Sequence, residues 1–215
     1  MPGDRTSDSR TEVLRDSPRM FDSPLLDRMS RVHPAVVPLI FVPTIAILAV
    51  AAWPGMQPRW TFFAWAAGGW FFWTLTEYWM HRVVFHFEPE KGIGARVHWI
   101  IHGVHHDHPN DPMRLVMPPS ASIPLASGFC LLFVFSLGVD SGLAFGSGFL
   151  LGYLIYDMTH YHMHHHIPTT ALGKKMRELH MRHHFQDDSC GYGVSAPFWD
   201  VVFRTSLRAK SKPPT

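Results

Sequence analysis

Cysteine is scarce in this chain, with only two among 215 residues. Cys130 lies in an apolar run and Cys190 in a polar stretch, so we expect neither a disulfide framework nor a metal site built on thiolates. A large excess of one charge sign is also missing, because 19 Lys and Arg residues stand against 17 Asp and Glu residues. This balance argues against nucleic acid as a partner. The first 30 residues are polar and carry both charge signs, so no cleavable signal peptide is expected.

Charged residues are nearly absent from four long segments, although the mean hydropathy of the whole chain is close to zero. The segments are Pro34–Trp53, Trp60–Trp79, Ala121–Val139 and Gly142–Met158. A helix that crosses a bilayer needs about 20 apolar residues. Four buried helices of a soluble core are the alternative, but uncharged runs of this length favour membrane spans. The sequence therefore predicts an all-α integral membrane protein with four transmembrane helices.

The Lys and Arg residues alternate between the segments that connect these spans. Six precede the first span, one lies in the first loop, four separate the second and third spans, none lies around Asp140, and eight follow the fourth span. Because positive residues favour the cytoplasmic side, both termini and the middle segment are predicted to be cytoplasmic. The protein would then lie in a bacterial inner membrane or in the endoplasmic reticulum.

This orientation predicts the domain organisation. Residues 1–17 are rich in Ser, Asp, Arg and Thr and are predicted to be disordered. Residues 18–207 would form one membrane domain, in which the histidine-rich segments 81–118 and 160–206 are cytoplasmic. Residues 208–215 would be a flexible tail.

Histidine is abundant, with 16 residues, of which ten form four spaced clusters. The clusters are His81 and His86; His102, His105 and His106; His160 and His164; and His180, His183 and His184. Each triad has i, i+3, i+4 spacing, so each can aim three imidazoles at one place. His81 and His86 are five residues apart, and a straight helix would splay them by about 140°. We therefore expect the helix to unwind or turn near Phe85.

One such cluster alone is often just solvated, but four at the same membrane face are hard to explain by packing. Imidazole is the commonest protein ligand for iron, zinc, copper and nickel. Ten donors exceed the needs of one metal ion, so the sequence predicts a dinuclear site, of a kind that can activate dioxygen. The sequence does not predict how the ten ligands divide between two metal ions.

The remaining polar residues near the clusters allow weaker predictions. Ligating imidazoles usually donate their second nitrogen to a carboxylate or carbonyl, and Asp157, Asp187 and His98 are candidates for this outer shell. The clusters contain no Glu-x-x-His pair, so a ferritin-like carboxylate site is not expected.

Longer motifs around the histidines resemble the membrane fatty acid hydroxylase superfamily, and within it the fatty acid 2-hydroxylases. The resemblance lies in SPRMFDSPLLDRMSR (17–31), HRVVFH (81–86), HGVHHDHPNDPMRLVMPP (102–119), HYHMHH (160–165), HMRHH (180–184) and GYGVSAPFWDVVF (191–203). It implies four transmembrane helices under a cytosolic helical layer, with the same ten histidines as ligands. It also implies two metal ions, with iron for activity; zinc can occupy such ligands instead. Eukaryotic members commonly carry an N-terminal haem domain for which this chain has no room, so we expect a separate electron-transfer protein.

The resulting hypothesis is a monooxygenase that uses dioxygen to hydroxylate a long acyl chain, at the carbon next to the carboxyl carbon. Arg114, Met117 and Tyr156 are the candidate substrate-binding residues. Arg114 is also compatible with a simple interfacial turn, from which its side chain would snorkel to the membrane surface. Two other functions stay open: a sterol or carotenoid hydroxylase or desaturase, and a membrane metal transporter. Transporters place their ligands near the bilayer midplane, whereas these histidines gather at span ends.

Overall fold

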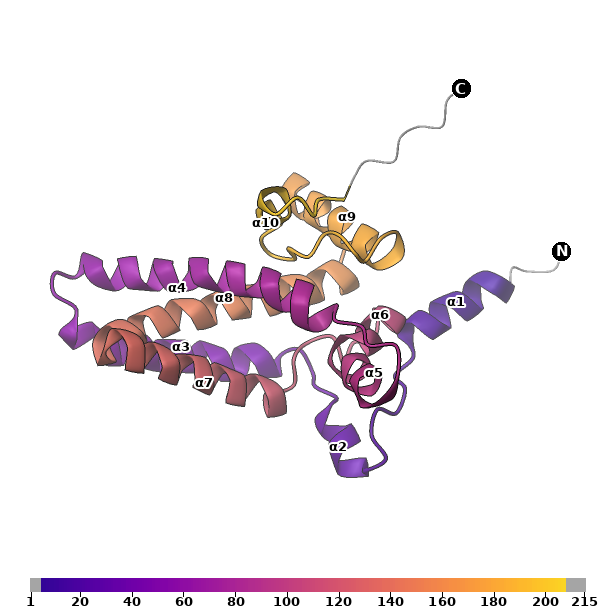
Figure 1. Cartoon of the computed structure of the whole chain (residues 1–215), viewed down its shortest axis with the longest axis horizontal. Helices are drawn as coiled ribbons and strands as arrows, with labels where there is room; N and C mark the ends of the chain where they lie inside the picture. Colours follow the sequence, from indigo (N-terminus) through magenta and orange to yellow (C-terminus); the bar gives the residue numbers. More distant parts are fainter. Residues whose placement is uncertain (1–4, 208–215) are drawn as a thin grey trace, which may run out of the picture.

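The computed structural model describes residues 5–207, and within that range it is helical without strands (Figure 1). The prediction of an all-α protein is thereby confirmed. The elements are α1 (Arg5–Arg15), α2 (Pro24–Met29), α3 (Val36–Ala52), η1 (Trp53–Gly55), α4 (Trp60–Trp79), η2 (Met80–Phe85), α5 (Gly92–His98), η3 (Trp99–Gly103), α6 (Val104–Asp107), α7 (Pro119–Leu137), α8 (Val139–His165), α9 (Ala171–Phe185) and α10 (Phe198–Val202).

The long helices α3, α4, α7 and α8 lie side by side as a bundle, and α8 packs against the other three (Figure 1). Three segments are long and apolar enough to cross a membrane: Val36–Gly55, Pro119–Leu137 and Val139–His165. The first and third of the bundle's helices, α3 and α7, expose large apolar side chains such as Leu39 and Phe135, which are 75% and 85% exposed. Such surfaces are stable against lipid rather than water. The chain is a multi-pass membrane protein.

Helix α4 has 20 residues but is not one of these three segments, because it contains five Trp and three Thr residues, two Gly residues and Glu77. It is held to α8 by close approach of the two backbones. A methyl group on Gly148 would lie 1.8 Å from the carbonyl oxygen of Ala66, and one on Gly69 would lie 1.9 Å from that of Phe145. Small residues at such crossings allow helices to pack tightly in membranes.

Aromatic side chains from all four long helices form the core of the bundle. Phe41 of α3 contacts Tyr153 of α8 with ring centroids 4.7 Å apart. Phe149 of α8 lies between Trp73 of α4 and Phe133 of α7, at 5.1 Å from each. The edge-to-face geometry of these pairs is favourable beyond the burial of area. Helix α8 is therefore fixed from three sides, which matters because it carries histidines at its end.

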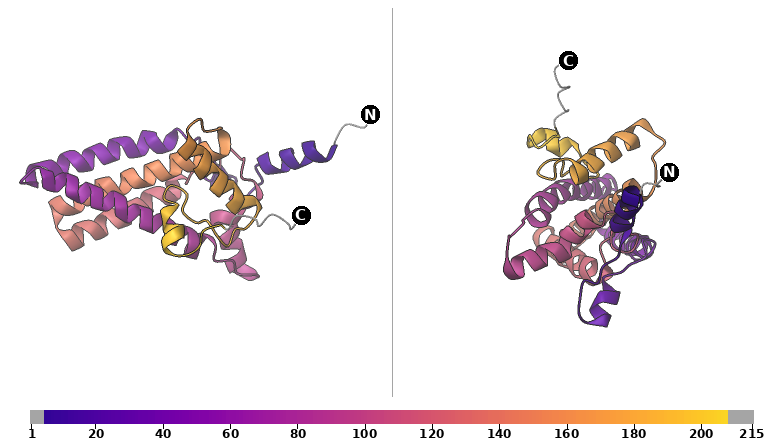
Figure 2. Two further views of the ribbon diagram at one scale, coloured as in Figure 1. Left: turned by 90° about the horizontal axis from the view of Figure 1, so that it is seen from above. Right: turned by 90° about the vertical axis from the view of Figure 1, so that its right-hand side faces the viewer.

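The shorter helices α5, α6, α9 and α10 gather at one end of the bundle, where α4 and α8 run into their histidines (Figure 2). Helix α8 is longer than expected, because it continues to His165 instead of ending near Met158. The predicted loop around Asp140 is reduced to Gly138, whose φ of +82° lets α7 and α8 adjoin.

The structure also differs from the sequence prediction near the N-terminus. Residues 1–17 were predicted to be disordered, whereas residues Arg5–Arg15 form α1. The end of this helix is attached to the segment after α6: Asn110 N–H donates to the carbonyl of Leu14, and His108 Nδ1 lies 2.6 Å from that of Val13. Composition cannot reveal such tertiary attachment. Residues 1–4 and the predicted flexible tail 208–215 lie outside the described residues.

Candidate metal centre

All ten clustered histidines converge at this end of the bundle and form two groups of five. In each group, one ring nitrogen per histidine lies within 4.8 Å of the other four. The first group is His81, His86, His102, His106 and His183, and the second group is His105, His160, His164, His180 and His184. The groups adjoin, because the rings of His106 and His184 have centroids 4.3 Å apart.

A local change from α- to π-helix brings His81 and His86 together, although they are five residues apart. Residues Met80–Phe85 form a π-helical turn, in which the His86 N–H donates to the His81 carbonyl at 3.1 Å. This i to i+5 bond brings residues five apart onto one face, and their Nε2 atoms lie 3.2 Å apart. The expectation that the helix departs from α geometry near Phe85 is confirmed.

The spacing allows each triad to aim three imidazoles at one place, but in the structure neither triad does so. His102 and His106 point into the first group, whereas His105 points into the second. Adjacent residues diverge by about 100° on a helix, so His105 and His106 cannot share a target when a second group lies beside the first. The triad on α9 divides in the same way: His183 joins the first group, and His180 and His184 join the second.

The nitrogen spacing suits metal ions. In the first group, Nε2 atoms lie 3.1 Å apart for His86 and His183, and in the second group 3.0 Å apart for His105 and His184. Ligand nitrogens about 2.1 Å from a metal and at right angles to each other are about 3.0 Å apart. The buried Nε2 of His160 has no hydrogen-bond partner among the described residues. These nitrogens fit metal ions better than they fit one another.

Burial determines the charge of these imidazoles. Desolvation lowers the pKa of His102 well below its ordinary value, and neighbouring histidines lower it further. The same causes lower the pKa of His86 to about 3 and that of His106 to about 2. At neutral pH the rings are therefore uncharged, which is the form that binds metal.

We expect the metal-free protein to lose stability as the pH falls below about 6.5. The unfolded chain protonates its histidines near that value, while the folded groups resist protonation. The unfolded state then binds more protons, so stability decreases as the pH falls and is nearly constant above about pH 7. Thermal unfolding of chelator-treated protein in detergent, from about pH 8 to pH 5, measures this. A melting temperature that does not change below pH 6.5 would contradict the burial of neutral imidazoles.

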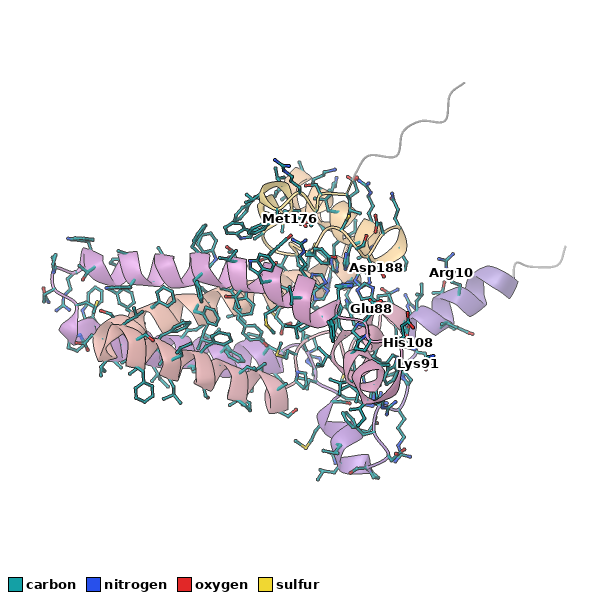
Figure 3. All side chains as sticks on the ribbon, in the orientation of Figure 1. Arg10, Glu88, Lys91, His108, Met176 and Asp188 are labelled. Carbon is teal, nitrogen blue, oxygen red and sulfur yellow. The ribbon has the colours of Figure 1, made fainter. Side chains whose placement is uncertain are left out.

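The second ring nitrogens find different partners in the two groups. His81 Nδ1 lies 2.7 Å from the carbonyl oxygen of Tyr192, and His183 Nδ1 lies 2.7 Å from that of Cys190. His86 Nδ1 lies 3.5 Å from Glu88 Oε1. Glu88 and Asp188, both exposed, lie near each other at this end of the bundle (Figure 3). Glu88 and the carbonyls of Tyr192 and Cys190 were not predicted from the sequence. Glu88 could have been suggested by its position two residues after His86, whereas the carbonyls leave no signal in the sequence.

The three outer-shell candidates from the sequence have other contacts. Asp157 is buried and accepts a hydrogen bond from the Tyr153 hydroxyl at 3.2 Å. Asp187 accepts bonds from the backbone and hydroxyl of Ser189. His98 Nε2 lies 3.8 Å from Glu88 Oε1, and thus next to the carboxylate that faces His86.

Two of the three candidate substrate residues line an apolar cavity of about 50 Å³ between α4, α7 and α8. Met117 and Tyr156 are in its wall, together with Phe85, Ala126 and other side chains. Arg114 instead holds the segment before α3: its Nη2 lies 2.8 Å from Asp27 Oδ1, and its Nη1 donates to the Pro18 carbonyl. Its contacts are those of a structural residue that anchors residues 17–31.

This chain is similar in sequence to known proteins. The family model for fatty acid hydroxylases matches residues 65–205, which include all ten clustered histidines. The dihydroceramide fatty acyl 2-hydroxylase FAH1 of Arabidopsis thaliana is 34% identical over 206 residues, which are 93% of this chain and 84% of that protein. The fatty acid 2-hydroxylase of Mus musculus is 32% identical over 91% of this chain and 58% of its own length.

A solved structure of full-length scs7p, in which only the hydroxylase domain is visible, superimposes with a TM-score of 0.81 at 33% identity. The match covers 88% of this chain and 72% of that one. The resemblance seen in the motifs is thus supported over most of the chain. This chain belongs to the fatty acid hydroxylase family.

Proposed function

We propose that this protein is a membrane-bound monooxygenase that hydroxylates carbon 2 of a long fatty acyl chain, with dioxygen as the oxidant. One oxygen atom enters the C–H bond and the other leaves as water, which requires two electrons and two protons. A separate electron-transfer protein would supply the electrons. The relatives named as fatty acid 2-hydroxylases support the position of attack.

The observation that carries this proposal is that two wall residues of the apolar cavity contact histidine rings, one in each group. Phe85 lines the cavity and stacks on His102 of the first group, with ring centroids 5.0 Å apart. Tyr156 also lines it and lies 5.8 Å from the ring of His160 in the second group. One wall residue of the cavity therefore borders each histidine group, and we propose that a substrate in the cavity extends past these two rings toward the metal ions.

We propose that the ten histidines bind two metal ions, five around each. Iron suits this all-imidazole donor set and, when bound, would supply the redox chemistry that activates dioxygen. Zinc would bind the same nitrogens without redox activity. The protein's own contribution is to hold the acyl chain beside the metal ions and to keep water away from it.

The size of the cavity limits how the substrate binds. Pockets that enclose a whole ligand usually measure about 300–1,000 Å³. A cavity of about 50 Å³ holds only a short part of a long acyl chain. We propose that the carbons next to the carboxyl group enter the cavity while the remaining tail stays in the bilayer.

We also propose that α4 spans the membrane as a fourth helix beside α3, α7 and α8, and that both termini are cytoplasmic. The distribution of Lys and Arg residues along the chain supports this orientation.

The test is reconstitution with ferrous iron, a reductant, an electron carrier and dioxygen, with fatty acids, acyl-CoAs, sphingoid amides, a sterol and a carotenoid as substrates. Mass spectrometry should detect products that gain one oxygen atom, located at carbon 2 by fragmentation. Zinc-loaded protein should give none. A product hydroxylated only on a sterol or carotenoid, or no product from any acyl substrate, would refute the proposal.

Filling the cavity should block acyl chains. We expect Ala126→Trp, which places an indole into the cavity, to lower kcat/KM for a long-chain substrate by more than about tenfold, since the excluded carbons lose their binding site. The metal content should not change. Leu131→Trp on the same helix is the matched control, because Leu131 is 57% exposed on the apolar surface. Equal activity of the two variants would show that substrate binds elsewhere.

A further inference from the structure

The segment from Cys190 to Gly193 lies between the first histidine group and helix α10. Its carbonyls face the histidines: those of Cys190 and Tyr192 each lie 2.7 Å from a ligand nitrogen, on His183 and His81. Its amides face the other way. The N–H groups of Tyr192 and Gly193 donate to the two carboxylate oxygens of Asp200, each at 2.9 Å.

The carboxylate of Asp200 is buried, with 4% of the residue exposed, and is fully engaged. Besides the two amides, it accepts the hydroxyl of Thr205 at 2.8 Å. Thr205 in turn accepts the N–H of Gly191 through its carbonyl at 2.9 Å. Asp200 therefore binds the amides of Tyr192 and Gly193 directly, and it also binds Thr205, whose carbonyl accepts from the amide of Gly191.

Helix α10 is itself fixed to α4, the helix that leads into His81. Trp199 Nε1 donates to the hydroxyl of Thr74 at 3.1 Å, and the Ser195 N–H donates to Glu77 Oε1 at 2.7 Å. The contacts of α10 with α4 therefore fix the position of the Asp200 carboxylate relative to His81, which follows α4.

The connection from Asp200 to His81 runs through a single peptide group. The carbonyl of Tyr192 and the N–H of Gly193 belong to the same amide. A carboxylate that accepts from the N–H polarises that amide and makes its carbonyl a stronger acceptor for His81 Nδ1. In many metal sites a carboxylate accepts directly from the ligating histidine, which fixes the ring and makes its other nitrogen more basic. Here a peptide would transmit the same effect.

The second group has no comparable support. The Nδ1 atoms of His164, His180 and His184 are buried and lack a hydrogen-bond partner among the described residues. Rings without such a bond are held by packing alone. Each group offers five imidazoles, but the ligands of the first group are better oriented than those of the second.

We propose that Asp200 is a positioning residue for the first histidine group, acting on His81 through the Tyr192–Gly193 peptide, and that it makes this group bind its metal ion more tightly than the second group does. The inference rests on the proposed metal ligands but not on hydroxylation, because it concerns binding alone.

The experiment is a zinc titration of detergent-solubilised, chelator-stripped protein against a coloured competing chelator. Wild-type protein should bind two zinc ions in two phases of different affinity. His183→Ala should remove the tighter phase and His105→Ala the weaker one, which assigns the phases. Asp200→Asn, which opposes an amide N–H with an NH₂ group, should weaken the tighter phase by about 10- to 100-fold and leave the weaker phase within about twofold. The control, Asp22→Asn, alters an exposed carboxylate before α2 and should change neither phase.

A merely structural role of Asp200 would weaken both phases together, and that result would overturn the proposal, as would an unchanged tighter phase. If Asp200→Asn does not fold, Thr205→Val provides the second test. It removes the hydroxyl bond to Asp200 but keeps the carboxylate, so it should weaken only the tighter phase, by a smaller factor. Equal weakening of both phases in this variant would also refute the proposal. Because no substrate is present, failure of hydroxylation and failure of this inference are separate results.

Discussion

Alanine at His183 or at His105 is expected to lower hydroxylase activity by more than about 100-fold, while the protein remains in the membrane. The two residues belong to different groups: His183 Nε2 faces His86 in the first, and His105 Nε2 faces His184 in the second. Each variant should retain one metal ion and lose the other. The measurements are product formation by mass spectrometry, metal content per chain, and the amount of protein in the membrane fraction.

The matched control is His162→Ala. His162 lies on α8 between His160 and His164, but it is exposed and stacks on His166 at 4.9 Å. Its loss should leave activity within about twofold. Full activity of either ligand variant would show that one group is dispensable, and loss of activity in the control would show that the end of α8 tolerates no change at all.

The set of ten histidines could be predicted from the sequence because spacing on a helix is a local property. His102 and His106 share a face whatever surrounds them. Their division into two groups could not be predicted, since it depends on which helix faces His105 across the site. The partners of His105 in the second group, such as His160 and His180, come from α8 and α9, far along the chain.

The apolar runs likewise predicted the long helices but not their exact character. The length and mean hydropathy of α3, α7 and α8 are high enough for a membrane span, whereas the mean hydropathy of α4 is too low. Tertiary packing explains why α4 nevertheless belongs to the bundle: its Gly69 allows contact with α8 that aliphatic residues would prevent. For Arg114 the sequence left a substrate-binding role and a structural role open, and its ion pair with Asp27 favours the structural role.

The segment GYGVSAPFWDVVF marked a resemblance without a physical reason in the sequence. In the structure that reason becomes visible, because the backbone carbonyl of Tyr192 in this segment accepts from His81, and that of Cys190 just before it accepts from His183. Backbone acceptors carry no side-chain signature, so only the carboxylate that organises them, Asp200, was open to detection. The outer shell of a metal site is therefore harder to predict than its ligands.

The geometry of the metal centre depends on contacts deep in the bundle, and Gly148→Ala should demonstrate this. The added methyl group would lie 1.8 Å from the Ala66 carbonyl oxygen, and a backbone atom cannot move aside as a side chain can. Overpacking of this kind costs about 1–3 kcal/mol. For a chain of this length we expect the melting temperature to fall by roughly 2–12 °C.

The same substitution should also weaken metal binding by both groups, which separates it from a change at either group alone. Helix α4 leads into His81 and His86, and α8 carries His160 and His164, so parting the two helices moves ligands of both groups. Gly128→Ala on α7 is the control: a methyl group there would meet nothing within 4 Å, and Ala is the better helix former. Its melting temperature should be unchanged or slightly higher. If Gly148→Ala instead melts at the temperature of the control and binds zinc normally, that result would show that the close contact of α4 and α8 does not position the two histidine groups.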